Sequence, residues 1–153
     1  MSLRLEDVMV GKVITVDIGA TVEEAVKIMN RHEIGCLIVV NGKDRPVGIV
    51  TERDMLKRVL VRLKDPRKTR ISKIMSTPLF FGTPHMDVEV AAKLMMRKKI
   101  KKLPVVENGN LVGLVTLTDL ARVQPEMIRI LKKLSVETLP PKRIRKVLDY
   151  YVS

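Results

Sequence analysis

Cysteine, tryptophan and closely spaced metal ligands are scarce or missing in this chain of 153 residues. It has one cysteine, no tryptophan and two residues each of Phe and Tyr. The single Cys36 excludes an internal disulfide framework and a zinc site built on cysteines. His32 and His85 stand alone, without the spacing of metal ligands. We therefore expect no required metal, and a core built from Val, Ile, Leu and Met.

Long apolar runs are also missing. No run approaches the roughly 18–20 residues that a membrane span needs, although 46% of the residues are hydrophobic. Arg4, Glu6 and Asp7 interrupt the start of the chain, where a secretion signal would carry an apolar stretch. These features predict a soluble, cytoplasmic protein with no membrane partner.

The net charge of +12 is unevenly distributed. Residues 1–66 carry 11 Lys/Arg and 10 Asp/Glu, a net +1, which leaves 18 and 7, a net +11, for residues 67–153. Such asymmetry indicates an anionic partner, either a nucleic acid, an acidic membrane or a phosphorylated small molecule. A solvated, charge-rich surface is the simpler interpretation for many of these charges.

The chain repeats itself. Identical residues recur 66 positions apart in the first part of each copy, at Met9 and Met75 and at Ala25 and Ala91. After a one-residue difference in the polar Asn-Gly turn, the offset is 65, and "GIVTERD" (48–54) returns as "GLVTLTD" (113–119). A hairpin turn tolerates such a change, so the two copies are homologous units.

Each copy predicts a β-α-β-β-α unit. In the first copy, Thr21-x-x-Glu24 is a capping box before an apolar stripe at helical spacing. The two central strands form an antiparallel hairpin, and a helix follows Thr-x-x-Asp. The expected first strands are 13–16 and 79–81, the expected first helices are 21–33 and 87–99, and the expected hairpin strands are "CLIVV", "PVGIV", "KLPVV" and "LVGLV".

The predicted class is α/β, with the two units packed through their sheets. One such unit of about 50–60 residues would be marginal alone. We expect unit 1 at 5–63, a polar linker at 64–72, unit 2 at 73–122 and a helical extension at 123–153. Pro125 is expected to open a helix through Leu134, and Ile144, Val147, Leu148 and Tyr151 give the tail an amphipathic pattern.

These residues resemble the cystathionine-β-synthase-type domain, or CBS domain, and two in tandem resemble a Bateman module. The paired motifs and the stretch "IKKLPVVENGNLVGLVTLTD" (100–119) carry the resemblance, which covers about residues 5–122. It implies a regulatory module, not an enzyme, that binds adenine nucleotides (AMP, ADP or ATP) in clefts between the units. S-adenosylmethionine and NAD are alternatives, because they share the adenosine part. The resemblance also implies a homodimer.

The motif residues suit such a ligand. A carboxylate accepts two hydrogen bonds, which matches the vicinal hydroxyls of a ribose, so Asp54 and Asp119 are the candidate ribose ligands. Thr51 and Thr116 can donate to a phosphate at the start of a helix. The simpler interpretation of both motifs is helix capping alone, but their duplication within a complete unit favours binding at one cleft at least.

The resemblance assigns further residues to each cleft. For the Asp119 cleft these are Val13, Ile14, Gly35, Cys36 and Ile38, and for the Asp54 cleft Leu79, Phe80, Ile100, Lys102 and Pro104. Leu114 is a further ligand-binding candidate that is assigned to neither cleft. The resemblance places Lys101 and Lys102 where the phosphate is reached, although a solvated charge run is the simpler interpretation. Arg53 stands where the second copy has Thr118, so the two clefts should not bind alike.

Two other functions remain open. The basic second half and the tail "PPKRIRKVLDYY" (140–151) fit a nucleic-acid-binding or protein-adaptor module. An enzyme is the least favoured class, because the sequence has no nucleophile triad, metal cluster or phosphate-binding loop.

Overall fold

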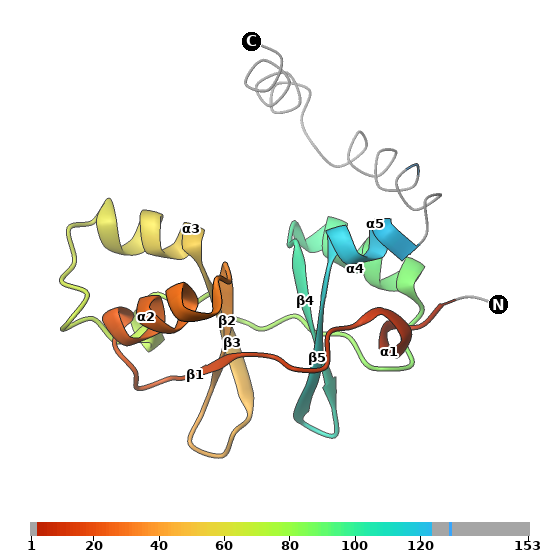
Figure 1. Cartoon of the computed structure of the whole chain (residues 1–153), viewed down its shortest axis with the longest axis horizontal. Helices are drawn as coiled ribbons and strands as arrows, with labels where there is room; N and C mark the ends of the chain where they lie inside the picture. The colour runs from red at the N-terminus through yellow and green to blue at the C-terminus, as the bar shows by residue number, and fades with distance from the viewer. Residues whose placement is uncertain (1–2, 124–128, 130–153) are drawn as a thin grey trace, which may run out of the picture. The chain divides into compact units, whose positions relative to one another are not determined.

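The computed structural model describes residues 3–123 and residue 129 (Figure 1). The predicted helices after Pro125 lie outside these residues. The contacts divide the chain into two compact units, which we describe separately. One consists of residues 11–81 and 106–113, and the other includes residues 3–10, 82–105 and 114–123. Each unit takes its larger part from one copy of the repeat.

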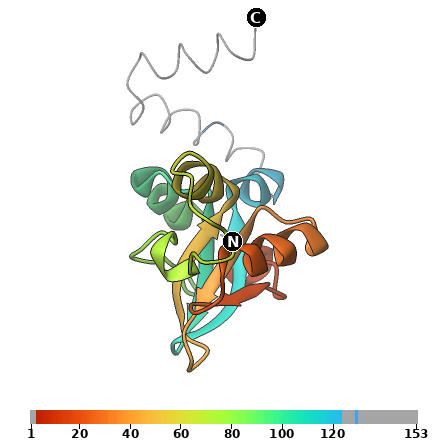
Figure 2. The same ribbon diagram turned by 90° about the vertical axis from the view of Figure 1, so that its left-hand side faces the viewer.

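The first unit contains a three-stranded sheet. Its strands β1 (Thr15–Asp17), β2 (Cys36–Val40) and β3 (Pro46–Thr51) lie in the order β1-β2-β3. β1 runs parallel to β2, and β2 and β3 form the predicted antiparallel hairpin. Its turn lies at the end opposite to the helix that follows β3 (Figures 1 and 2). The end of β3 therefore carries the first Thr-x-x-Asp motif.

Helix α2 (Val22–His32) confirms the predicted capping box. The Thr21 side chain accepts the Glu24 N–H, and the Glu24 carboxylate accepts the Thr21 N–H. The helix ends at Glu33, which adopts a left-handed conformation. Of the four apolar residues at helical spacing, Val22, Ala25 and Met29 are buried, whereas Val26 is 43% exposed.

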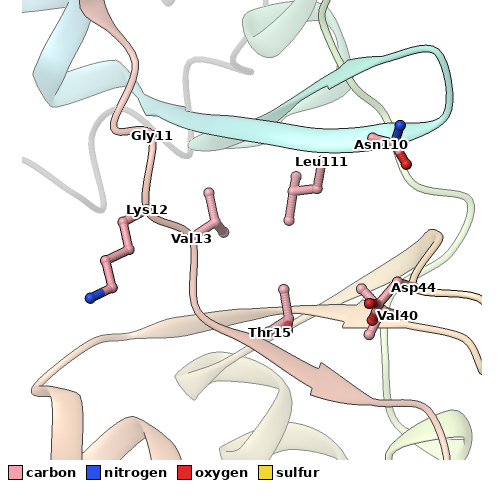
Figure 3. Close-up of a pocket in the computed structure, with 8 residues that line it drawn as sticks. All are labelled: Gly11, Lys12, Val13, Thr15, Val40, Asp44, Asn110 and Leu111. Atoms are coloured by element: carbon pink, nitrogen blue, oxygen red, sulfur yellow. The ribbon is translucent and has the colours of Figure 1, made fainter.

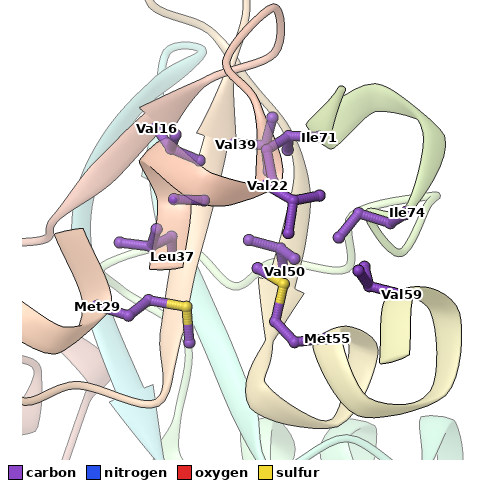
Figure 4. Close-up of a cluster of buried hydrophobic side chains, with 11 residues drawn as sticks. Val16, Val22, Met29, Leu37, Val39, Val50, Met55, Val59, Ile71 and Ile74 are labelled. Carbon is purple, nitrogen blue, oxygen red and sulfur yellow. The ribbon is translucent and has the colours of Figure 1, made fainter. Parts of the chain in front are cut away.

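The core of this unit is aliphatic, as the composition predicts (Figure 4). Because α2, the sheet and the segment after β3 all contribute to it, the core fixes where β3 ends. Its buried members are Val16, Val22, Ala25, Met29, Leu37, Val39, Val50, Met55, Val59, Ile71 and Ile74.

Helical segments lie on both sides of the predicted linker (64–72), and the second of them begins inside it. Helix α3 (Glu52–Met55) continues into a π-helical segment, η1 (Leu56–Leu60), and a short 3-10 helix, η2 (Ile71–Lys73), follows. Ile71 is fully buried, and its N–H donates to the carbonyl of Ala20. Residues 71–76 therefore pack with the first copy.

The second unit is built from α1 (Leu5–Val8), α4 (Val88–Lys98) and α5 (Leu117–Val123), with residues 102–105 of β4 (Lys102–Glu107) and 114–116 of β5 (Asn110–Thr116). Helix α4 confirms the expected helix, with Asp87 as its N-cap and Lys99 as its left-handed C-cap. The buried residues of this second unit include Leu5, Val88, Ala91, Ala92, Met95, Leu103, Val105 and Leu120.

The α/β class is confirmed, but the strand predicted at 79–81 is wrong. The structure has only one parallel bridge there, between Gly82 and Val105. In the first copy, the Ile38 N–H donates to the Ile14 carbonyl at 3.4 Å. The residue equivalent to Ile38 is Pro104, which has no N–H to donate, so the corresponding rung cannot form. The strand predicted at 13–16 begins two residues later, at Thr15.

Gly48 provides a test of the packing at the end of the linker. An added Cβ would lie 2.8 Å from the Met75 sulfur and 3.1 Å from the Ser76 carbonyl oxygen. We expect Gly48→Ala to lower the free energy of unfolding by about 1–3 kcal/mol. In urea denaturation, the control Gly42→Ala should have a smaller effect, because nothing lies within 4 Å of its Cβ. Equal losses would contradict this packing.

Candidate functional site

The first Thr-x-x-Asp motif forms a closed capping box at the start of α3. Thr51 ends β3 in an extended conformation, and its side chain accepts the Asp54 N–H at 3.3 Å. In return, Asp54 Oδ2 accepts the Thr51 N–H at 2.9 Å. The predicted capping is therefore confirmed for this motif, and it holds the carboxylate beside the end of the strand.

The second motif has the same geometry at the start of α5. The Thr116 hydroxyl accepts the Asp119 N–H at 3.0 Å, and Asp119 Oδ2 accepts the Thr116 N–H at 3.0 Å. Both boxes thus use one carboxylate oxygen for their own helix.

Each helix is also tied to the strand before it in the same copy. The Glu52 N–H donates to the Gly35 carbonyl, and the Leu117 N–H donates to the Lys101 carbonyl, both at 3.1 Å. Gly35 and Lys101 are equivalent positions in the repeat. The structure therefore places an exposed lysine beside the second box and a glycine beside the first.

Asp54 has two further partners. The Ser76 hydroxyl donates to Oδ1 at 3.3 Å, and Arg58 Nε lies 3.7 Å from the same oxygen. Arg58 Nη1 also donates to the carbonyls of Ile74 and Met75, at 2.8 and 3.0 Å. The Asp54 residue is only 8% exposed. Its carboxylate therefore joins α3 to the end of the linker.

Asp119 differs in this respect. It is half-buried, and its Oδ1 has no hydrogen bond or ion pair to any residue that the structure describes. Among residues 3–123 and 129, the second box therefore differs from the first in having one carboxylate oxygen without a hydrogen bond or ion pair from a side chain.

Ser76 and Arg58 did not emerge from the sequence as partners of Asp54. A signal existed for Arg58, because it stands four residues after Asp54 on one helical face. For Ser76 the signal was indirect. It follows Met75, the repeat partner of Met9, but its pairing with Ile49 appears only in the fold.

Among the strand residues predicted for the site, Cys36 lies directly beside the box of its own copy. Cys36 is paired with Thr51 across the β2–β3 hairpin. The side chains of Cys36, Ile38 and Pro104 are buried, those of Val13, Ile14, Leu79, Phe80, Ile100, Lys102 and Leu114 are half-buried, and those of Arg53, Lys101 and Thr118 are exposed. The pairing of each box with strand residues of the other copy stays a prediction.

An open pocket of about 450 Å³ lies elsewhere in the first unit (Figure 3). Apolar Val13, Val40 and Leu111 line it together with Lys12, Asp44 and Asn110 at its rim. Arg45 Nη1 donates a hydrogen bond to Asn110 Oδ1 at 3.1 Å. Val13 is the one predicted site residue among those that line this pocket.

A second hollow, of about 610 Å³, lies between α2 and α3. Its walls include Val26 and Leu56, whose side chains are unusually exposed for apolar residues on helices. Such a groove is typical of a surface that another helix covers.

Two kinds of site are missing from residues 3–123 and 129. No three His, Cys, Asp or Glu side chains gather there as metal ligands would. Within the same residues, every helix is too short or too polar to cross a bilayer.

Comparison with known proteins gives one consistent family. The model of the CBS domain matches residues 5–61 and 71–126. An uncharacterized protein of Methanopyrus kandleri is 38% identical over 84% of this chain and 69% of its own length. The CBS domain-containing protein YhcV of Bacillus subtilis is also 38% identical, over 76% of this chain and 82% of its own.

A solved structure agrees with these relatives. A conserved CBS domain protein of Thermoplasma acidophilum, described as having unknown function, superposes with a TM-score of 0.78 at 33% identity. The superposition covers 93% of this chain and 83% of that one.

Proposed function

This chain belongs to the CBS domain family, and we propose on that premise that it is a regulatory module that binds an adenosine-containing ligand without catalysing a reaction. CBS domain proteins are in general regulatory ligand-binding modules, and the finer assignment to adenine nucleotides is ours. We take residues 5–63 and 73–122 as its two copies. The AMP, ADP and ATP class is the proposed ligand, and S-adenosylmethionine and NAD are alternatives.

The observation that carries the proposal is the open oxygen of Asp119. A ribose diol offers two O–H donors, and an ionised carboxylate accepts hydrogen bonds without donating any. The capping box already holds Asp119 Oδ2 in place, so the carboxylate loses little freedom when a ligand binds. A hydrogen bond to a charged acceptor is also stronger than one between neutral groups.

Lysines supply the charge for a phosphate group. Lys101 is exposed and Lys102 half-exposed at the start of β4, and the Lys101 carbonyl accepts the first N–H of α5. Lys101 immediately precedes β4 and Lys102 begins it, so both lysines belong to the segment that is tied to the second box. Lysine binds phosphate as a point charge, and the net +11 of residues 67–153 favours an anionic ligand further.

Diol recognition can be tested with matched ligands. We expect calorimetric titration to show binding of AMP, and at least about tenfold weaker binding of 2′,3′-dideoxy-AMP, which lacks both hydroxyls. Replacing both lysines (Lys101→Gln with Lys102→Gln) should weaken AMP binding while leaving adenosine binding unchanged.

Equal affinity for AMP and its dideoxy analogue would contradict a carboxylate that reads the ribose. Absence of nucleotide binding, with DNA or RNA binding that falls steeply as salt rises, would favour the nucleic-acid alternative instead.

We further propose that the protein is a homodimer whose interface includes the groove between α2 and α3. Leu56 is 56% exposed and lines this groove with Val26. An apolar surface of this kind is buried favourably by a second apolar helix face. A second copy of the chain would supply the same surface, as a twofold interface requires.

The dimer can be tested by light scattering after size exclusion. The unmodified chain should have twice the monomer mass, and Leu56→Lys should shift it toward the monomer. Val61→Lys is the control, because Val61 is 76% exposed and does not line the groove. A monomeric unmodified chain, or dissociation by the control alone, would contradict this interface.

A further inference from the structure

The two capping boxes have the same motif but different neighbours. Ser76 is bridged to Ile49, and Val10 is bridged to Leu114 in the same antiparallel manner. Ile49 and Leu114 are repeat partners at an offset of 65, and Ser76 and Val10 at an offset of 66. Val10 therefore takes the place in the second copy that Ser76 takes in the first.

The same exchange occurs on the helix after each box. Arg58 stands four residues after Asp54, and Val123 stands four residues after Asp119. Outside the capping box, Asp54 has a hydrogen bond from Ser76 and an ion pair with Arg58. The second copy has a valine at both of these positions. The side chain of valine has no hydrogen-bond donor.

Protein groups meet both oxygens of the first carboxylate. A carboxylate has about four acceptor positions. Oδ2 of Asp54 takes the Thr51 N–H and the Thr51 hydroxyl, and Oδ1 takes the Ser76 hydroxyl and faces Arg58. A ribose that binds there must displace these donors, which would then have to find new partners.

The second carboxylate has room for a ligand. Thr116 alone donates to Asp119 among the residues that the structure describes, and it uses Oδ2. Val10 is 54% exposed and Val123 is 44% exposed, so the exchange also leaves apolar surface in this copy where the first has a hydroxyl and a guanidinium. Apolar surface suits a nucleoside, whose base is buried against aliphatic side chains.

We propose that Asp119 is the ribose ligand of this protein, and that Asp54 is a structural anchor that holds α3 to residues 74–76. This inference rests on the proposed function and deepens it, because it assigns the nucleoside to one of two boxes with identical motifs. Ser76 and Arg58 contact Oδ1 of Asp54 in the first box. Val10 and Val123 stand at the equivalent positions of the second box and offer Asp119 no side-chain donor.

Exchanging these neighbours between the boxes tests the inference. The first variant, Val10→Ser with Val123→Arg, gives the second box the donors of the first. It should weaken AMP binding at least about tenfold, because the ribose must compete for Asp119. The reverse variant, Ser76→Val with Arg58→Val, frees Asp54 and should not weaken AMP binding.

Single replacements of the two carboxylates complete the test. In titrations with AMP, Asp119→Asn should lose at least about tenfold in affinity and keep its melting temperature within a few degrees. Asp54→Asn should lower the melting temperature more, and should keep its affinity for AMP within about twofold when titrated below that temperature. If Asp54→Asn does not fold, the exchange variants alone decide, because Val10 and Val123 are exposed.

Two failures are distinguishable. Suppose that the unmodified chain binds AMP. If Asp54→Asn or the Ser76/Arg58 variant loses AMP binding, or if the Val10/Val123 variant and Asp119→Asn retain AMP binding, the assignment to Asp119 is wrong. The proposed function stands in that case. If the unmodified chain binds neither AMP nor adenosine, the proposed function fails, and this inference fails with it.

Discussion

A carboxylate that caps its own helix through one oxygen keeps its second oxygen for hydrogen bonds to another group. Both Thr-x-x-Asp motifs of this chain obey this constraint, since in each the aspartate accepts the threonine N–H through Oδ2. What the second oxygen does then depends on the neighbours that the fold supplies. In the first copy it meets the Ser76 hydroxyl and Arg58, and in the second it meets no donor from the described residues. The two copies thus share the motif but differ in its surroundings, which is the basis for proposing that only the second box binds a ligand.

The neighbours come from segments that lie outside the hairpins. Residues 74–76 follow the linker, yet Ser76 pairs with Ile49 at the end of the first hairpin. Val10 pairs in the same way with Leu114. The first residues of each copy therefore pair with a hairpin of the other copy, and they determine which residue lies beside that hairpin. Because Ile71 and Ile74 are fully buried, the position of Ser76 is fixed by the core. Arg58 strengthens this connection by donating to two carbonyls of the same segment.

Much of the fold was predictable because it depends on local patterns. The helices at 22–32 and 88–98 have apolar stripes and capping residues, and the hairpins have apolar strands around a polar turn. The strand at 79–81 failed because its partner strand has Pro104 in place of a donor, a nonlocal effect. For the site, the capping boxes were predictable from four residues each. The contact between Asp54 and Ser76 was not, because the serine is 22 residues away and is brought there by the bridge to Ile49. The sequence repeat nevertheless held the information, in the exchange of Ser76 and Arg58 for valines.

The central claim is that two identical motifs provide one ligand site. Native mass spectrometry of the unmodified protein with a saturating concentration of AMP counts the bound nucleotides for each chain, whatever the oligomeric state. The account predicts one AMP for each chain, because a ribose at Asp54 would have to displace the Ser76 hydroxyl and Arg58 from Oδ1. Two AMP molecules for each chain, bound with similar affinity, would contradict it.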